Sequence, residues 1–402
     1  MSDWTEFSLG EIADPQDRYS FSGGPFGSNL KREEYTSSGI RIIQLQNIGD
    51  GHFKNDYKIY TSERKADELM SCNIFPREII LSKMGDPVAR AVIIPCSEER
   101  YLMASDGIRL KVDESRFDTF FILNAINSPE FRSSAEAVAV GTTRKRIGLT
   151  TLKKLTISAP PLPEQRKIAE IISGIDRTIA RYLQKREKLS KLRSALRSDL
   201  LSGRKGSWGM SDMEWLSGTL QDIARPANDK WIPSQNENSI PYIGLEHILP
   251  ENPKVADHGK SSEVISTKNK FKKGDTLFGK LRPYLQKVAF ADFTGICSTD
   301  IIPIRASAET DPAFLYYLIS SPKVIAKAIE SSAGNVMPRA SWQDIRGIEI
   351  AIPPLPEQKK IAEILSGVDH QMATLLDAEK KYVSLKQAIA ADLFSGRKRV
   401  SV

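Results

Sequence analysis

Apolar residues recur at every seventh position along two stretches of the chain. The stretches open almost identically, with PPLPEQRKIAEIISGID from Pro160 and PPLPEQKKIAEILSGVD from Pro353. The recurring positions are Ile168, Ile175, Tyr182, Leu189 and Leu196 in the first stretch, and Ile361, Val368, Leu375, Tyr382 and Ile389 in the second. This spacing, kept over about forty residues, predicts two long helices that pair with each other like a coiled coil. The alternative is that each helix packs only on its own domain, as an amphipathic surface helix does.

The residues near the start of each stretch refine this prediction. Pro163 and Pro356 suit the first turn of a helix, where a missing N–H costs no hydrogen bond. Gly174 and Gly367 are expected to bend or interrupt the helices shortly afterwards. Helices of about forty residues would extend roughly 60 Å, which suits a spacer that holds two domains apart.

The rest of the chain alternates short apolar runs with clusters of turn residues. Runs such as REIILSKM and DTLFGK predict strands, whereas DTFFILNAINSPEF and DPAFLYYLISSPKV predict helices punctuated by proline. We therefore expect a mixed α/β fold of two globular domains joined by two long antiparallel helices. The expected boundaries are 1–158 and 208–351 for the domains, and 159–207 and 352–402 for the helical regions.

The two halves are copies of one another. Residues 118–206 correspond to residues 311–399 at a constant offset of 193, without an insertion. Upstream of these ranges the match is looser and its offset drifts to 200 and then 211. The helical regions agree closely, whereas the domains share mainly their apolar positions. This pattern favours a pseudo-twofold repeat. The two helices would share one function, and the two domains would have different functions of the same kind.

Composition narrows the class of partner. The net charge of +7 favours a polyanion, of which nucleic acid is the commonest. The three cysteines form no CxxC pair and suit a reducing cytoplasm. The sequence starts without a basic and apolar leader, and no apolar run is long enough to cross a bilayer, so neither secretion nor a membrane partner is expected.

Basic residues cluster at corresponding places in the two domains. The predicted DNA-binding residues are Lys83, Arg90, Thr143, Arg144, Lys145 and Arg146 in the first domain, and Lys280, Arg282, Tyr284, Lys287, Asn335 and Arg339 in the second. Arg can bind guanine through two hydrogen bonds and Asn can do the same with adenine, while Lys and Arg also bind phosphates. Solvated basic loops are the alternative. Residues 177–206, with ten Lys or Arg against two acids, could likewise follow DNA phosphates or simply face water.

Catalytic signatures are missing from the sequence. It has no GxxxxGK[ST] phosphate loop and no Asn-Pro-Pro-aromatic element of adenine methyltransferases, and its four histidines are isolated. FSGGPFG at Phe21 has the glycines of a cofactor loop but does not lie between a strand and a helix. SERK at Ser62 contains the Glu-x-Lys of many nucleases within a polar run that is expected to be a loop. The sequence therefore predicts a binding protein without catalytic or metal-ligating residues.

Two divergent domains, each followed by a PPLPEQ helix, resemble the specificity (S) subunit of type I restriction-modification systems. The resemblance covers essentially the whole chain, and GPFGSNLKREEY and GTTRKRIGLTTLKKLTI also resemble target-recognition domains of that family. It adds Lys31 to the expected DNA-binding residues. The second domain lacks the GPFGSNLK element, which leaves its DNA contacts less defined.

The resemblance implies a complete set of partners. Each domain would read one half of a bipartite double-stranded DNA site, and the helices would set the spacing. Two methylation (M) subunits would bind the chain and supply S-adenosylmethionine chemistry, and restriction (R) subunits would use ATP and Mg²⁺. The chain itself would hold no cofactor and would work in a bacterial or archaeal cytoplasm. The expected subunit-binding residues are Pro163, Glu164, Gln165, Pro356, Glu357 and Gln358.

Two other classes of function remain open at this point. The first is an enzyme, such as a DNA methyltransferase or a nuclease with a built-in reader, which methylation by the isolated chain would reveal. The second is a scaffold that joins proteins without DNA, which salt-dependent DNA binding would exclude.

Overall fold

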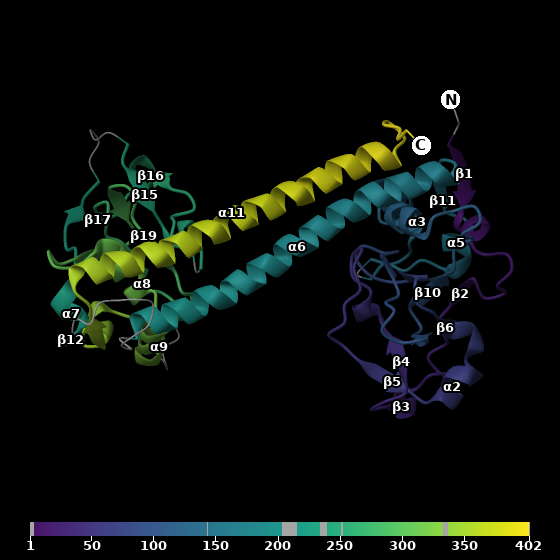
Figure 1. Cartoon of the computed structure of the whole chain (residues 1–402), viewed down its shortest axis with the longest axis horizontal. Helices are drawn as coiled ribbons and strands as arrows, with labels where there is room; N and C mark the ends of the chain where they lie inside the picture. The colour runs from purple at the N-terminus through teal and green to yellow at the C-terminus, as the bar shows by residue number, and fades with distance from the viewer. Residues whose placement is uncertain are drawn as a thin grey trace. The chain divides into compact units, whose positions relative to one another are not determined.

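The structure is a computed structural model that describes residues 4–142, 144–202, 215–233, 239–250, 252–332 and 337–401. It divides into two compact units, one made of Met1–Arg181 with Lys380–Val402 and the other of Tyr182–Glu379. Each unit contains one α/β domain and part of each of two long helices, α6 (Leu162–Leu201) and α11 (Leu355–Phe394) (Figure 1).

The first domain is built on short, mostly antiparallel strands. They are β1 (Thr5–Ser8), β2 (Phe21–Gly23), β3 (Tyr35–Thr36), β4 (Ile40–Ile43), β5 (Ile59–Thr61), β6 (Asn73–Ile74), β7 (Ile79–Ser82), β8 (Ala91–Ile93), β9 (Tyr101–Met103), β10 (Gly107–Leu110) and β11 (Thr156–Ala159). One sheet has the order β2-β10-β7-β8, another β3-β5-β4-β9-β6, and β1 pairs with β11. Within the five-stranded sheet, β4 and β9 are parallel.

The second domain repeats this arrangement. Its strands are β12 (Leu216–Thr219), β13 (Ala224–Pro226), β14 (Lys230–Trp231), β15 (Pro241–Ile243), β16 (Gly259–Lys260), β17 (Lys268–Phe271), β18 (Thr276–Gly279), β19 (Val288–Phe290), β20 (Gly295–Cys297), β21 (Ile301–Ala306) and β22 (Glu349–Ile352). The sheets are β13-β21-β18-β19, β14-β17-β20-β15-β16 and β12-β22, again with one parallel pair, β15 and β20. The mixed α/β fold and its internal repeat are therefore confirmed.

Short helices cover the sheets in both domains. They are α1 (Leu9–Ile12), α2 (Glu63–Glu68), α3 (Thr119–Ile126), α4 (Pro129–Val138) and α5 (Leu149–Lys153), then α7 (Leu220–Ile223), α8 (Pro312–Ile319), α9 (Pro322–Ser331) and α10 (Trp342–Ile345). The carboxylates of Asp118 and Asp311 accept hydrogen bonds from the first-turn N–H groups of α3 and α8. The SERK run, expected to be a loop, instead begins α2, because Ser62 caps that helix.

The two long helices run antiparallel within each unit. In the first unit, Lys386 of α11 pairs with Asp176 of α6, and the residues beyond α11 reach Glu164 near the start of α6. In the second unit, Arg186 pairs with Glu379 and Arg193 with Asp369. In each unit, later residues of one helix thus meet earlier residues of the other. The predicted mutual pairing is confirmed.

The hydrophobic seam is buried at its ends and half-buried along its middle. Ile168 and Leu196 of α6, and Ile361 of α11, are buried where the helices meet the domain cores, whereas Tyr182 and Leu189 are half-buried. Two helices without further neighbours can cover only one stripe of each other. Both helices are continuous, so the expected break at Gly174 and Gly367 does not occur.

Candidate nucleic-acid interface

In the first domain, the predicted basic loop is fastened to the end of a sheet. The backbone N–H of Lys83, just after β7, donates to the Asp106 carbonyl at 2.7 Å, and the N–H of Ile147 donates to the Lys83 carbonyl at 2.9 Å. Arg146 pairs with Met84 in a β-bridge, and its guanidinium binds the Asp106 carboxylate. The segments around Lys83, Asp106 and Arg146, which are distant in sequence, therefore meet at one place, which we call the first junction.

The second domain forms an equivalent junction with the same backbone hydrogen bonds. The N–H of Lys280 donates to the Asp300 carbonyl at 2.8 Å, and the N–H of Ala340 donates to the Lys280 carbonyl at 3.0 Å. The Arg339 guanidinium lies 3.2 Å from the Asp300 carboxylate. The side chains of Arg146 and Arg339 are exposed to nearly the same degree, 55% and 56%. The junctions are structural equivalents, as their places in the repeat predict.

Asp106 and Asp300 are functional candidates that sequence reasoning missed. Each precedes the strand that pairs with β7 or β18, so its carboxylate can hold an arginine of the neighbouring loop. A charge-assisted bond of this kind orients a guanidinium while leaving its outer N–H groups free to bind. The available signal was an acid directly before a strand at corresponding places in both domains.

The other predicted side chains differ in what they can offer a ligand. Arg144 and Lys31 are exposed. Lys145 is bound to Glu136, and this hydrogen bond raises the pKa of Lys145. Lys83 and Arg90 are half-buried beside the same junction. Thr143 lies outside the described residues.

In the second domain, Arg282 is exposed and Tyr284 is 51% exposed, so both can reach a partner. The Lys287 ammonium donates to the Leu245 carbonyl at 2.6 Å and so has a bond within the domain. Lys280 is half-buried at the junction. Asn335 lies outside the described residues. Whether any of these side chains contacts DNA stays a prediction.

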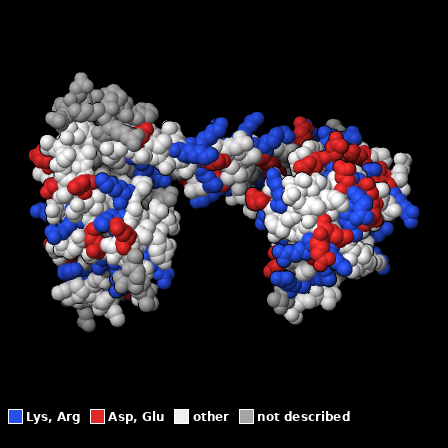
Figure 2. All heavy atoms as spheres, turned by 90° about the horizontal axis from the view of Figure 1, so that it is seen from below, with Lys and Arg blue, Asp and Glu red and all other residues white. Residues whose placement is uncertain are grey.

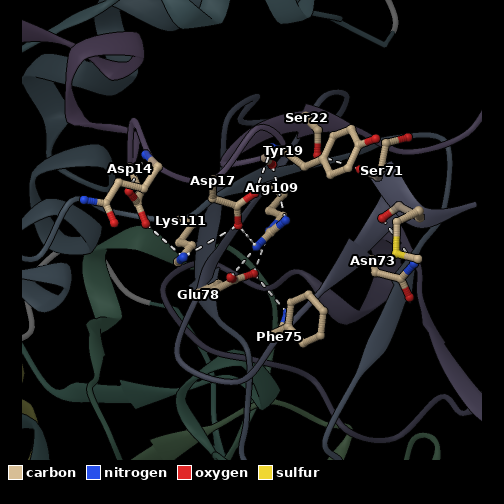
Figure 3. Close-up of polar contacts among 12 residues, drawn as sticks. Asp14, Asp17, Tyr19, Ser22, Ser71, Asn73, Phe75, Glu78, Arg109 and Lys111 are labelled. Carbon is tan, nitrogen blue, oxygen red and sulfur yellow. Dashed lines mark hydrogen bonds and ion pairs between the residues drawn. The ribbon is translucent and has the colours of Figure 1, made fainter.

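Each domain also contains an Arg–carboxylate pair whose acid is buried. In the first domain, Arg109 of β10 forms two hydrogen bonds with Glu78, of 2.7 and 2.6 Å, and a third with Asp17 (Figure 3). In the second, Arg305 of β21 binds Asp275 in the same bidentate way, at 2.8 and 2.7 Å.

The carboxylates of these pairs also accept hydrogen bonds from the backbone, which indicates a structural role for the pairs. Glu78 accepts from the N–H of Phe75, and Asp275 accepts from the N–H of Lys272, three residues upstream in each case. The bond to Asp275 raises the pKa of Arg305. Each pair connects a strand to the turn before its neighbouring strand, which is a structural rather than a catalytic arrangement.

The glutamate and glutamine side chains of the PPLPEQ motif bind other groups of the same chain. Gln165, which is 1% exposed, accepts from the N–H of Asp118 and donates to the Pro160 carbonyl. Gln358 makes the same bonds with Asp311 and Pro353. Glu164 and Glu357 are also buried. These buried side chains fix the start of each helix, whereas Pro163 and Pro356 are exposed there. Contact with a partner subunit stays a prediction.

The long helices present further basic groups to solvent. Arg177, Arg181, Lys185 and Lys188 of α6 are exposed. Lys and Arg side chains are prominent over the helical region on the face drawn in Figure 2. Among the described residues, no group of three or more His, Cys, Asp or Glu is placed to hold a metal ion. No helix within the described ranges is long and apolar enough to cross a membrane.

A duplicated α/β domain with a basic junction in each copy, carried on paired helices, is the architecture of a two-site recognition protein. The family of type I restriction modification DNA specificity domains matches residues 1–191 and 212–383. The chain belongs to this family.

Specificity subunits of type I restriction enzymes are similar to this chain in sequence. The specificity subunit of the type I restriction enzyme EcoDI from Escherichia coli is 26% identical over 64% of this chain and 65% of its own length. The EcoBI specificity subunit from the same species is 24% identical over 98% of this chain and 86% of its own. The chain thus spans just under two thirds of the first relative and most of the second.

The fold has also been seen in solved structures. A type I restriction-modification S subunit from M. genitalium is 18% identical and superimposes with a TM-score of 0.62, over 98% of this chain and 96% of that chain. A chain from a study of the assembly of the type I R-M system is 14% identical, with a TM-score of 0.56. At these identities the likeness establishes the fold alone.

Proposed function

We propose that this chain is the DNA-recognition subunit of a type I restriction-modification complex. Each domain reads one half of a bipartite site in double-stranded DNA, and the paired helices set the distance between the half-sites. The chain carries out no chemistry itself. It brings a methyltransferase, and in a complete system a nuclease, to a sequence that it selects.

The observation that carries this proposal is the equivalence of the two junctions. Arg146 on Asp106, and Arg339 on Asp300, are exposed guanidinium groups oriented by a carboxylate at the same place in both domains. An oriented guanidinium suits bidentate binding to guanine or to a phosphate. The loops around the two arginines differ in sequence, which is what two readers of different half-sites require.

The partners follow from the duplication of the helices. Two equivalent helix openings, at Leu162 and Leu355, offer two equivalent places for copies of one methylation subunit. We infer that the methylation subunits bring S-adenosylmethionine and that restriction subunits bring ATP and Mg²⁺, so no cofactor is assigned to this chain. The proposed location is the cytoplasm, where the DNA of the host lies.

The proposal is tested by reconstitution with the methylation subunit from the same source. The assembled complex should methylate adenine within one bipartite motif, and the chain or the methylation subunit alone should not. Sequencing the modified DNA identifies the motif. Methyl transfer by the isolated chain would identify an enzyme instead, and assembly without salt-dependent DNA binding would identify a scaffold.

A further inference from the structure

The two junctions have the same backbone hydrogen bonds, but the loop residues before the arginine are basic in the first domain and apolar in the second. Arg144 and Lys145 precede Arg146 in the first domain, whereas Met337 and Pro338 occupy the corresponding places before Arg339 in the second. The bonds to Lys83 and to Lys280 show that these loops are held at the same position on equivalent strands. The difference therefore lies in what each loop presents, and not in where the loop lies.

The apolar character of the second junction extends to the adjacent turn. Met337 is 59% exposed, and Tyr284 and Leu285 of the short 3-10 helix η6 (Pro283–Leu285) are also exposed. The N–H of Arg282 donates to the Pro338 carbonyl at 2.8 Å, which ties the turn to the loop that carries Met337. Three large side chains with apolar surface thus belong to two loops joined at the junction.

The turn that carries Tyr284 and Leu285 has an unfavourable backbone conformation. Arg282 and Gln286, on either side of η6, have φ angles of 53° and 51°, a region that residues other than glycine rarely adopt. Such conformations persist only where the surroundings enforce them, and they gather at binding sites. Here the bond from Arg282 to Pro338 and the bridge between Leu281 and Arg339 enforce the turn.

Positive charge borders the apolar side chains. Arg282 and Arg339 are exposed, and Lys280 lies at the same junction. A surface with an apolar centre and a cationic edge fits a polyanion that also displays apolar groups. In the major groove of DNA, the one such group on a base edge is the methyl group of thymine.

We propose that the second domain reads its half-site through contacts of Met337, Tyr284 and Leu285 with thymine methyl groups. The first domain, which has Arg144 and Lys145 at the matching places, reads its half-site mainly through hydrogen bonds. This inference rests on the proposed function. It assigns a base chemistry to one domain, which the duplication alone does not.

The test replaces thymine by uracil, which differs only in the absent methyl group. The half-site read by each domain is first identified in the complex with the methylation subunit, by exchanging residues 208–351 for those of another specificity subunit. Binding is then measured on duplexes in which each thymine of one half-site is replaced in turn. In the second domain's half-site, at least one replacement should weaken binding roughly three- to fivefold, the effect expected for losing one buried methyl group. Replacements in the other half-site should have no effect.

Side-chain variants connect the effect to this surface. In Met337→Ala, the difference between thymine and uracil at the sensitive position should shrink or disappear, as in a double-mutant cycle. Ile265→Ala is the matched control, because Ile265 is exposed in the same domain but belongs to neither loop. This variant should keep the full difference.

Three results would overturn the inference while leaving the proposed function intact. The first is a second half-site without an A·T pair. The second is a half-site in which no uracil replacement changes binding. The third is a Met337→Ala complex that loses its methylation subunit but keeps its preference for thymine, which would make the surface a protein contact. A complex that binds all DNA sequences equally would refute the proposed function itself.

Discussion

The guanidinium of Arg399 binds the carboxylate of Glu164 through two hydrogen bonds, of 2.7 and 2.6 Å. The bond fastens the residues after α11 to the first turn of α6, across 235 positions of sequence. In the second copy of the motif, the equivalent glutamate has a different partner. Glu357 accepts a hydrogen bond from the indole N–H of Trp215 at 2.6 Å. The position equivalent to Arg399 holds Gly206, which explains the different partner.

Replacing Arg399 by Ala should destabilise the first unit. The Glu164 side chain is only 6% exposed and would lose a bidentate partner, which costs about 1–2 kcal/mol once the 38% exposure of Arg399 is allowed for. Thermal unfolding of the full chain measures the loss. Arg397→Ala is the control, because Arg397 makes a looser surface pair with Asp392 at 3.4 Å in the same tail.

The effect of Arg399→Ala should also depend on pH. The hydrogen bond from Arg399 lowers the pKa of Glu164 below its ordinary value of 4.5. The contribution is therefore complete above about pH 4.5, where the unfolded chain has also lost the proton, and it fades as the pH falls through the lowered value. Equal differences between wild type and variant at pH 7 and well below pH 4 would show that the ion pair is not the source.

A second prediction concerns the helix pair in the second unit. Asp369 of α11 binds Arg193 of α6 at 2.7 Å and accepts from the Tyr317 hydroxyl at 2.8 Å. Its side chain is 7% exposed, so Asp369→Ala removes both the counter-ion of Arg193 and the acceptor of the buried Tyr317 hydroxyl, and should cost about 3 kcal/mol. Asp377→Ala, at an exposed position of the same helix, should change the unfolding free energy by less than about 0.5 kcal/mol. If the two variants melt alike, the helices do not depend on this contact.

The third prediction tests the first junction. The double variant Arg144→Ala with Arg146→Ala should weaken DNA binding by the assembled complex. If the arginines hold phosphates, the loss is similar on all sequences and the salt dependence becomes shallower by about one unit per lost contact. If they read bases, discrimination at one half-site falls by roughly 1–3 kcal/mol per bidentate contact.

A matched control comes from elsewhere in the first domain. Arg64, at an exposed position of α2 and paired with Glu68, offers the same charge outside the junction. Arg64→Ala should bind DNA like the wild type. Unchanged affinity of the double variant at moderate salt would remove the junction from the interface.

Sequence reasoning succeeded where the physical signal is local. The seven-residue apolar spacing and the proline openings identify α6 and α11, because both features act within a few turns of helix. The recurrence of basic residues at corresponding places in the two copies is also visible in the sequence, and their contact with DNA stays a prediction. The continuity through Gly174 was not predicted, because helix pairing outweighs the roughly 1 kcal/mol that a glycine costs.

Contacts between distant segments escaped prediction. The resemblance places Glu164 among the subunit-binding residues, and nothing in the sequence indicated that its carboxylate binds Arg399, at the other end of the chain. The pairing of Arg146 with Asp106 depends on which strands are neighbours, and strand order cannot be read from single runs of apolar residues. The same limitation hid the buried pair of Arg109 and Glu78.

The last prediction follows from the way the helix openings are anchored. Gln165 bonds to the backbone N–H of Asp118 and to the carbonyls of Pro160 and Arg116, and Gln358 makes the same set of bonds in the second copy, with Glu309 in place of Arg116. Because these partners are main-chain groups, which every sequence supplies, the anchoring of the helix openings does not depend on the side chains of the domain that precedes them. A hybrid in which residues 1–158 come from another specificity subunit should therefore fold and assemble. Its methylated motif should have one new half-site, one unchanged half-site and the original spacing, which sequencing of modified adenines would reveal. The reciprocal exchange of residues 208–351 should change only the other half. If either exchange alters both half-sites, or changes the spacing instead of the bases, the two domains do not read DNA independently.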